Sequence, residues 1–280
     1  MTQCGLRVCL KNSLIQHGHL NNRVYVIKLD PDDIPDIIRF ADDLARKEGY
    51  SKICVRVPES SVERFASAGY TPEARVPFFF RGKDTAVFMA KYPDPGRNTV
   101  PHATALGNVL SSAFGYAGAR SAEGPLPHEF SLTQGHTGDA TEIAALFRSV
   151  FKTHPYPGFD PDYIRESMQG QVRYFIIRKS HQLAAVASCE VDSENRNVEM
   201  TDFATGPLFR GRGFAGILLH AMETDMKNNG VLLAHTIARA MFHPINAVFA
   251  GAGYQFGGLL PNDISICGSL ESMNVWYKKV

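Results

Sequence analysis

The sequence predicts an α/β (α+β) protein in which a smaller N-terminal α/β domain precedes a C-terminal domain with a mixed central sheet. β-rich runs alternate with segments of helical apolar periodicity in both halves, and each half closes with two consecutive strands, which favours antiparallel pairing. A stretch over residues 93–128 contains Pro, Gly and Ser and keeps no periodicity. We therefore predict domains at 1–92 and 129–280, joined by a linker at 93–128.

In the N-terminal half, the β-rich run at 23–29 predicts a strand, and apolar residues on one face predict a helix over about 32–47. Aspartates at its start and Gly49 at its end suit the helix dipole and a C-terminal cap. A strand at 52–57, a short helix that ends near 65–70 and strands at about 74–80 and 86–92 complete this half.

In the C-terminal half, a short strand at 130–132 precedes a helix, which Asp139 can cap with Glu142 three residues on. A second helix follows Pro161. The remaining predictions are strands at 173–178, 183–191 and 197–205, a helix at 213–229, a strand at 231–238, a short helix that ends at 249–254 and two closing strands, the last at 273–279.

A weak internal repeat links the two halves. Phe65-x-x-x-Gly69-Tyr70 matches Phe249-x-x-x-Gly253-Tyr254, and two strands follow each copy. The N-terminal domain is on this interpretation a truncated copy of the last part of the C-terminal one. The alternative is that many helix-to-strand turns use a Gly-aromatic pair.

Composition excludes several classes of protein. The chain has 280 residues, 44% hydrophobic and 20% charged, with a net charge of +1, so it has no bulk electrostatic reason to bind nucleic acid or an anionic membrane. Its five cysteines are scattered, and CxxC and HExxH are absent, which argues against a disulfide framework and a metal. Reduced cysteines, no signal peptide and no apolar run of about 20 residues predict a cytoplasmic protein.

The segment TGPLFRGRGFAG at 205–216 is the sharpest local feature. A strand enters it and an amphipathic helix leaves it, so glycines, helix N–H groups and two arginines converge, which suits a pyrophosphate. Gly211-x-Gly213-x-x-Gly216 also fits the weak GxGxxG pattern of dinucleotide-binding folds. Residues intervene after the strand, and Arg239 stands where an acidic residue is expected, so only an NADP-type variant remains. A plain Gly-rich turn is the third interpretation.

Arg210-x-x-Gly213-x-Ala215 resembles the R/Q-x-x-G-x-G/A motif of GNAT acetyltransferases, and the order of predicted elements over 129–280 resembles theirs. The resemblance implies the GNAT acyl-CoA N-acyltransferase fold, preceded by a partial GNAT-like unit, and acetyl-CoA as cosubstrate. The residues that it implies for binding acetyl-CoA are Phe203, Ala204, Thr205, Arg210, Gly211, Arg212, Gly213, Phe214, Ala215, Asn246 and Phe249. For Asn246 an ordinary asparagine at a helix start is the alternative.

The chain also resembles one branch, the β-lysine N-acetyltransferases. The segments that carry this are EMTDFAT at 199–205, TIARA at 236–240 and ESMNVWY at 271–277, with QHG at 16–18, NRVY at 22–25, GYSK at 49–52 and MAKY at 89–92 in the N-terminal half. The resemblance implies acetylation of the ε-amine of β-lysine, the product of lysine 2,3-aminomutase, to give an osmolyte. Two-domain members often form homodimers.

Glu199 is the candidate general base, because only about one lysine-type amine in 10³ is neutral at pH 7. It lies 11 residues before Arg210, the offset at which GNAT histone acetyltransferases carry their catalytic glutamate. Asp202 is the second candidate, and strand alternation predicts the opposite face for it. A solvated carboxylate is the alternative for Glu199. Backbone N–H groups near 203–205 are candidates for binding the oxyanion.

The general acid and the acceptor-binding residues are less sharply indicated. GNATs often use a tyrosine to protonate the leaving thiolate, and Phe249 occupies that place here. His154 and Tyr156 lie in a substrate-facing loop or in an ordinary Pro-rich loop. Glu271 and Asn274 can meet a cationic amine or serve a buried structural role.

Three alternative functions stay open from the sequence. The first is a GNAT that acts on a polyamine or a protein lysine. The second is a non-catalytic acyl-CoA sensor, which Phe249 favours. The third is a dinucleotide reductase, which requires NADP binding.

Overall fold

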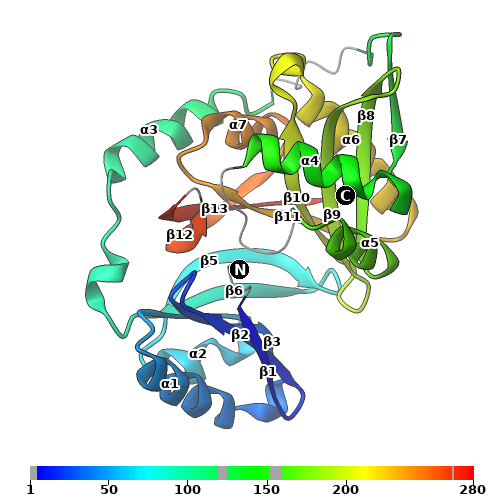
Figure 1. Cartoon of the computed structure of the whole chain (residues 1–280). Helices are drawn as coiled ribbons and strands as arrows, with labels where there is room; N and C mark the ends of the chain where they lie inside the picture. Colours follow the sequence, from blue (N-terminus) through cyan, green and yellow to red (C-terminus); the bar gives the residue numbers. More distant parts are fainter. Residues whose placement is uncertain (1–4, 119–124, 152–158, 267) are drawn as a thin grey trace.

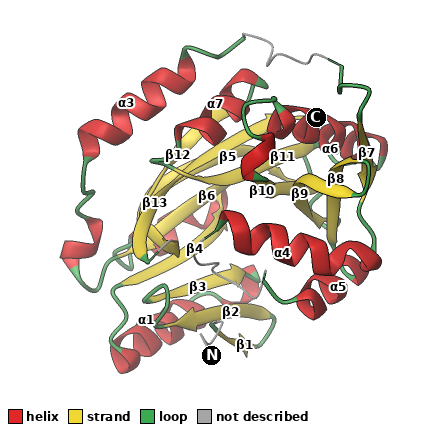
Figure 2. Ribbon diagram, turned by 45° about the horizontal axis from the view of Figure 1, so that its top comes forward, coloured by secondary structure: helices red, strands yellow, loops and turns green. Residues whose placement is uncertain are grey.

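The structure is a computed structural model that describes residues 5–118, 125–151, 159–266 and 268–280. One continuous sheet of 13 strands runs through the described part of the chain (Figure 1, Figure 2). Its order is β1-β2-β3-β4-β6-β5-β12-β13-β11-β10-β9-β8-β7. No helix in these ranges is long and apolar enough to cross a membrane.

We call strands β1–β6 with helices α1 and α2 the N-terminal unit. Their bounds are β1 (Leu6–Leu10), β2 (Ser13–Gly18), β3 (Arg23–Lys28), α1 (Asp36–Glu48), β4 (Lys52–Pro58), α2 (Val62–Ala66), β5 (Thr71–Phe80) and β6 (Asp84–Lys91). Apolar residues of α1 and α2 pack with the odd-numbered residues of β4, such as Ile53 and Val55, on one face of the sheet. Strands β1 and β2 lack a clear sequence signal, and the sequence analysis did not predict them.

Strands β7–β13 with helices α4–α7 form the C-terminal unit. Their bounds are β7 (Phe130–Gln134), α4 (Ala140–Val150), α5 (Pro161–Gln169), β8 (Val172–Lys179), β9 (Gln182–Asp192), β10 (Asn197–Thr205), α6 (Phe214–Asn228), β11 (Leu233–Arg239), α7 (His243–Gly251), β12 (Gln255–Ile266) and β13 (Ser269–Lys279). Helices α6 and α7 pack on one face of this part of the sheet, and α4 and α5 on the other. The predicted helices and strands of this unit are confirmed within a few residues.

Two local details differ from what the sequence indicates. Residues 93–128 contain helix α3 (Ala103–Phe114), which packs against α7 and places Phe114 5.7 Å from the Trp276 ring. Asp139 occupies the N-cap position of α4, as predicted, but its side chain makes no capping hydrogen bond there. Its carboxylate accepts from the backbone N–H of His136 and from Arg178, which also binds Glu142, so both acids are held by the same guanidinium.

The two units share one pairing pattern. In each, an antiparallel strand pair (β2–β3, β9–β10) is followed by a parallel pair (β3–β4, β10–β11) and then by an antiparallel hairpin (β5–β6, β12–β13). The Gly-aromatic turns also coincide, because Phe65 and Tyr70 pack edge to face, as do Phe249 and Tyr254. This topology supports the proposal that the N-terminal unit is a partial copy of the C-terminal one.

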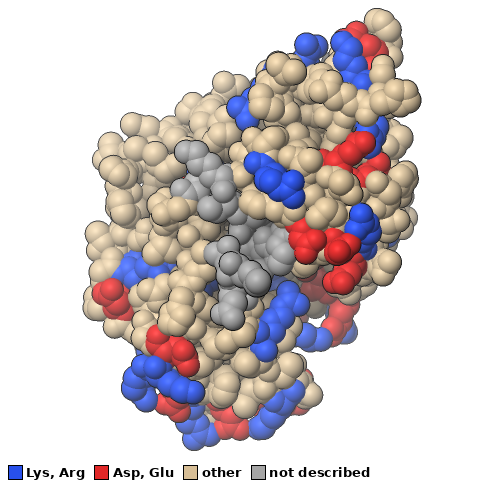
Figure 3. Space-filling view, in the orientation of Figure 1, with Lys and Arg blue, Asp and Glu red and all other residues tan. Residues whose placement is uncertain are grey.

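The units join edge to edge through β5 and β12, where Gly258 is registered with Ala74. A side chain at Gly258 would meet the Glu73 carbonyl oxygen at 2.3 Å, and its φ of 145° also requires glycine. The face of the N-terminal sheet opposite α1 and α2 is thereby turned toward the C-terminal unit (Figure 1). On the side seen in Figure 3, charges of both signs are interspersed.

Candidate active site

Strands β10 and β11 diverge in the middle of the sheet. Their parallel pairing ends at Glu199 and His235, although β10 continues to Thr205 and β11 to Arg239. Strand β10 stays paired with β9 through a bulge at Asp202, whose φ is 54°. Beyond Glu199, backbone groups of β10 that would pair with β11 are available to a ligand.

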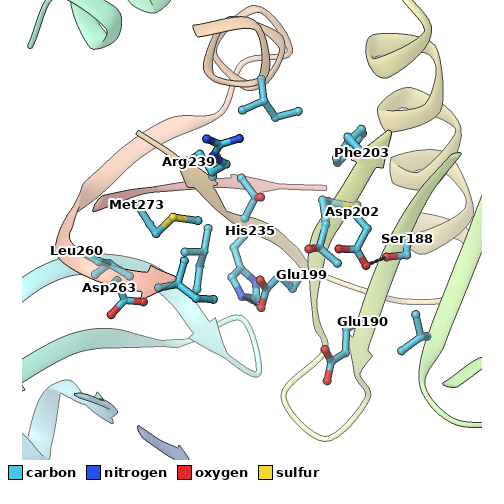
Figure 4. A pocket seen from close by; sticks show the side chains of 18 of the residues that line it. Ser188, Glu190, Glu199, Asp202, Phe203, His235, Arg239, Leu260, Asp263 and Met273 are labelled. Atoms are coloured by element: carbon cyan, nitrogen blue, oxygen red, sulfur yellow. Dashed lines mark hydrogen bonds and ion pairs between the residues drawn. The ribbon is translucent and has the colours of Figure 1, made fainter. Parts of the chain in front are cut away.

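A cavity of about 1490 Å³ lies where these strands diverge. Strands β8–β11, the loop before α6 and the start of α7 supply one wall, and strands β1–β6 of the N-terminal unit, with β12 and β13, supply the other. Figure 4 shows Glu199 and Asp202 on one side and Asp263 and Met273 on the other. Because ordinary ligand pockets span roughly 300–1,000 Å³, the cavity has room for two ligands.

The glycine-rich loop enters the cavity ahead of α6. Gly211 and Gly213 have φ values of 76° and 74°, a left-handed conformation that only glycine adopts without strain. The turn leads into α6, a helix of 15 residues that begins at Phe214. Its first N–H groups have no helical partners, and the exposed Arg210 and Arg212 add positive charge. The loop therefore suits a pyrophosphate.

The structure separates the residues predicted to bind acetyl-CoA into two groups. Those that line the cavity are Phe203, Thr205, Arg210, Gly211, Arg212, Gly213, Phe214 and Ala215. Ala204 points away from it, because its side chain is buried in the cluster beneath α4 and α5. The bulge at Asp202 and the alternation of β10 account for this difference.

Asn246 and Phe249 are corrections to the predicted cofactor site, because both side chains are fully buried away from the cavity. Asn246 donates to the carbonyls of Arg239 and Phe242. Its amide oxygen accepts from Asn274 and from the indole N–H of Trp276, each at 2.9 Å. With all its hydrogen bonds made inside the protein, Asn246 ties α7 to β11 and β13.

Phe249 packs between Phe203 and Tyr254, with ring centroids 5.6 and 4.9 Å away. It supports the cavity wall through Phe203, which does line the cavity.

The predicted acceptor-binding residues have structural partners or lie outside the described part. Asn274 is buried and bonded to Asn246. Glu271 accepts both hydrogen bonds of a bidentate pair from Arg239, at 2.7 and 2.6 Å, and so fixes a guanidinium that lines the cavity. His154 and Tyr156 lie outside the described residues.

Three polar side chains form a row across neighbouring strands. The register places Glu190 of β9 directly opposite Glu199, and Glu199 beside His235 of β11. The His235 Nε2 atom lies 3.7 Å from the Glu199 Oε2 atom, and neither ring nitrogen has a hydrogen-bond partner among the described residues. Buried polar groups are seldom left without partners, and the His235 ring lines the cavity.

The pKa of the Glu190 carboxyl is raised, chiefly because the surrounding protein desolvates it and next because of the negative charge of Glu199. Like charges directly opposite each other in a sheet are unfavourable. Two adjacent carboxylates favour binding of a cation, or of a proton that neutralises one of them. Glu190 and His235 were not among the predicted residues, since only the strand register brings them beside Glu199.

Asp202 lies on the same face as Glu199, and the prediction of opposite faces was wrong. Ser188 shares the face of Glu190 and Glu199, and its hydroxyl donates to the Asp202 carboxylate at 2.7 Å (Figure 4). The bulge inserts a residue and breaks simple alternation. Asp202 is thus part of the cavity wall beside the row, with its carboxylate held by Ser188.

Across the cavity, a buried ion cluster joins the two units. Asp263 of β12 accepts from Arg23 at 2.5 Å and lies 3.1 Å from Lys52. Lys52 is also 3.1 Å from Glu73. Arg23 and Lys52 hold the pKa of the Asp263 carboxyl far below its usual value, despite burial. No group of three or more His, Cys, Asp or Glu side chains within the described ranges is placed to hold a metal ion.

Comparisons with known proteins agree with this geometry. A profile of the acetyltransferase (GNAT) family matches residues 142–243. A β-lysine N(6)-acetyltransferase of Methanococcus maripaludis is 34% identical over 96% of this chain and 97% of its own length. The N-acetyltransferase YodP of Bacillus subtilis is 29% identical over 96% of both chains.

Among solved structures, the ribosomal-protein-S18-alanine N-acetyltransferase of Escherichia coli matches 54% of this chain and 94% of its own, with 14% identity and a TM-score of 0.48. The near full-length similarity to the Methanococcus relative decides the family. The chain belongs to the GNAT family of acetyltransferases and is an N-acetyltransferase.

Proposed function

We propose that the protein transfers the acetyl group of acetyl-CoA to the ε-amine of β-lysine. One observation carries this: the anion-binding loop and the Glu190–Glu199–His235 row border a single cavity, at the point where β10 and β11 diverge. The name of the Methanococcus relative supports β-lysine as the acceptor. The N-terminal unit walls off the cavity, which favours a small acceptor over a protein surface.

Acetyl-CoA binds with its pyrophosphate at the loop 210–215 and the first turn of α6, whose fixed N–H groups match a diphosphate. Its thioester then lies along β10, toward Glu199. Backbone N–H groups of β10 near Phe203 and Thr205 donate to the carbonyl oxygen as negative charge develops there.

Glu199 accepts the proton of the acceptor amine. A lysine-type ammonium has a pKa near 10.4, so about one molecule in 10³ is neutral at pH 7 and a base nearby speeds the reaction. The ammonium first gives one proton to Glu199, which passes it to solvent. The neutral nitrogen then forms a C–N bond to the thioester carbon, the C–S bond breaks to release the CoA thiolate, and the surplus proton on the nitrogen goes to the free Glu199 carboxylate. Glu190 and Asp202 increase the negative charge that attracts the ammonium.

The thiolate leaves without help from residue 249. Phe249 has no proton to donate and is buried behind Phe203. A CoA thiolate is a tolerable leaving group, since its thiol pKa is near 8.5 by analogy with cysteine. Loss of the usual tyrosine is therefore compatible with catalysis.

The test is thiol release from acetyl-CoA with a panel of β-lysine, α-lysine, spermidine and a lysine peptide. β-Lysine is expected to give the highest kcat/KM, and Glu199→Gln to reduce it by about 10²-fold or more at pH 7. Glu129→Gln is the control, because the exposed Glu129 carboxylate pairs with Lys179 and does not line the cavity. A different preferred amine overturns the assignment of β-lysine, and acetyl-CoA binding without turnover overturns catalysis.

A further inference from the structure

The wall that the N-terminal unit turns toward the cavity carries positive charge. Along β4, Ile53, Val55 and Val57 face the core beneath α1, so the alternate residues, among them Cys54 and Arg56, face the cavity. Arg56 is partly buried and lines the cavity. Its position on the N-terminal unit is distant in sequence from every residue of the acetyl-transfer site.

No carboxylate of the described residues lies within ion-pair distance of Arg56. Of the other basic residues of this wall, Arg23 pairs with Asp263 and Lys28 with Glu194. Arg7 of β1 also lines the cavity without an ion pair among the described residues, but it is exposed, whereas Arg56 is partly buried. The Arg56 guanidinium carbon instead lies 4.4 Å from the centre of the Phe79 ring. An aromatic platform holds the plane of the guanidinium and leaves its N–H edge for a ligand.

Arg56 is also connected to the catalytic row by direct contacts. The Phe79 ring that supports it meets the His235 ring edge to face, with centroids 5.0 Å apart, and His235 lies beside Glu199. The positive charge of Arg56 lowers the pKa of Glu190, against the burial that raises it. A guanidinium and a pair of carboxylates therefore face each other across one cavity.

We propose that Arg56 binds the carboxylate of the acceptor, so that the N-terminal unit selects an amino acid over a simple diamine. This inference rests on the proposed function and names the residue that recognises the carboxylate of the substrate. An acceptor with an ammonium at one end and a carboxylate at the other matches Glu190 and Glu199 on one wall and Arg56 on the other. Arginine suits this role because its parallel N–H groups bind both carboxylate oxygens.

The test compares β-lysine with 1,4-diaminopentane, which is β-lysine without its carboxyl group. Arg56→Met keeps the apolar stem over Phe79 and removes the charge. We expect the ratio of kcat/KM for β-lysine to that for the diamine to fall about 10- to 100-fold, mainly through the KM of β-lysine, as fits the loss of a charged hydrogen-bonded pair. Arg56→Lys is expected to restore part of the ratio.

Arg64→Met is the matched control, because Arg64 is exposed on α2, which packs on the other face of the same sheet. It is expected to leave the ratio unchanged. If Arg56→Met leaves the ratio of the two kcat/KM values unchanged, including by an equal loss with both substrates, the inference is overturned while β-lysine acetylation stands.

A second pair, α-lysine and 1,5-diaminopentane, tests the carboxylate site at Arg56 separately from the assignment of β-lysine as the substrate. If the wild type prefers α-lysine to β-lysine, and Arg56→Met abolishes the preference for α-lysine over its diamine, then the proposed substrate is wrong and the carboxylate site is right. If the wild type prefers either diamine to its amino acid, the carboxylate site is wrong.

Discussion

Asp263→Asn is expected to loosen the junction between the two units. The Asp263 carboxylate comes from β12, whereas the Arg23 and Lys52 cations that surround it come from β3 and β4. Lys52 is fully buried, and Arg23 is nearly so. Asparagine preserves the shape and an acceptor oxygen but leaves two buried cations with only Glu73 to balance them.

Removing one partner of a buried ion cluster costs about 3–5 kcal/mol. The pKa of Asp263 is lowered in the folded protein, so its stabilising contribution is complete above the unfolded pKa near 3.9 and is lost as pH falls toward the folded value. The difference between wild type and variant is therefore expected to be constant from about pH 5 to 8 and to shrink below about pH 4.

Urea unfolding followed by the fluorescence of the single Trp276 measures this difference, with circular dichroism as a second probe. Asp225→Asn is the control, since its half-exposed pair with Arg173 lies within the C-terminal unit and is worth at most about 1 kcal/mol. A loss below about 1 kcal/mol for Asp263→Asn, or the same loss as in the control, would refute the role of the cluster.

Three further substitutions test other parts of the structure. Glu190→Gln is expected to raise stability at pH 8 by up to about 1 kcal/mol, because it removes the like-charge pair with Glu199. Because the pKa of Glu190 is raised, the gain is expected to shrink as pH falls to 4, and thermal unfolding at both pH values measures it. Gly213→Ala is expected to raise the KM for acetyl-CoA about tenfold, because its φ of 74° costs alanine roughly 1–2 kcal/mol, and an unchanged KM would contradict the assigned loop. Asn246→Ala is expected to cost about 1–3 kcal/mol in urea unfolding and to leave that KM unchanged, whereas a raised KM with full stability would restore it as a cofactor ligand.

Much of the fold, and the anion-binding loop, could be predicted from local patterns in the sequence. The helix that follows Gly213, the glycines with positive φ and the Gly-aromatic turns depend on neighbouring residues, so a single chain displays them. The match between Phe65–Tyr70 and Phe249–Tyr254 in the sequence is also a match in the structure, because both ring pairs pack edge to face.

Long-range pairing explains what the sequence did not reveal. Glu190 joins Glu199 only through strand register, and a bulge at Asp202 turns that side chain to the unexpected face. In the sequence, Asn246 cannot be told from an ordinary asparagine at a helix start. Only the fold shows that its amide oxygen accepts a hydrogen bond from Trp276. Arg56 meets the catalytic row only because β5 joins β12 edge to edge and carries Phe79 across.

The most direct test of the central claim is the site of acetylation, determined by NMR on the product formed from β-lysine and ¹³C-acetyl-CoA. The account predicts a single product acetylated on the ε-nitrogen, formed by the wild type and greatly slowed in Glu199→Gln. Acetylation of the β-nitrogen, a mixture of both products, or no product from a protein that binds acetyl-CoA would contradict it.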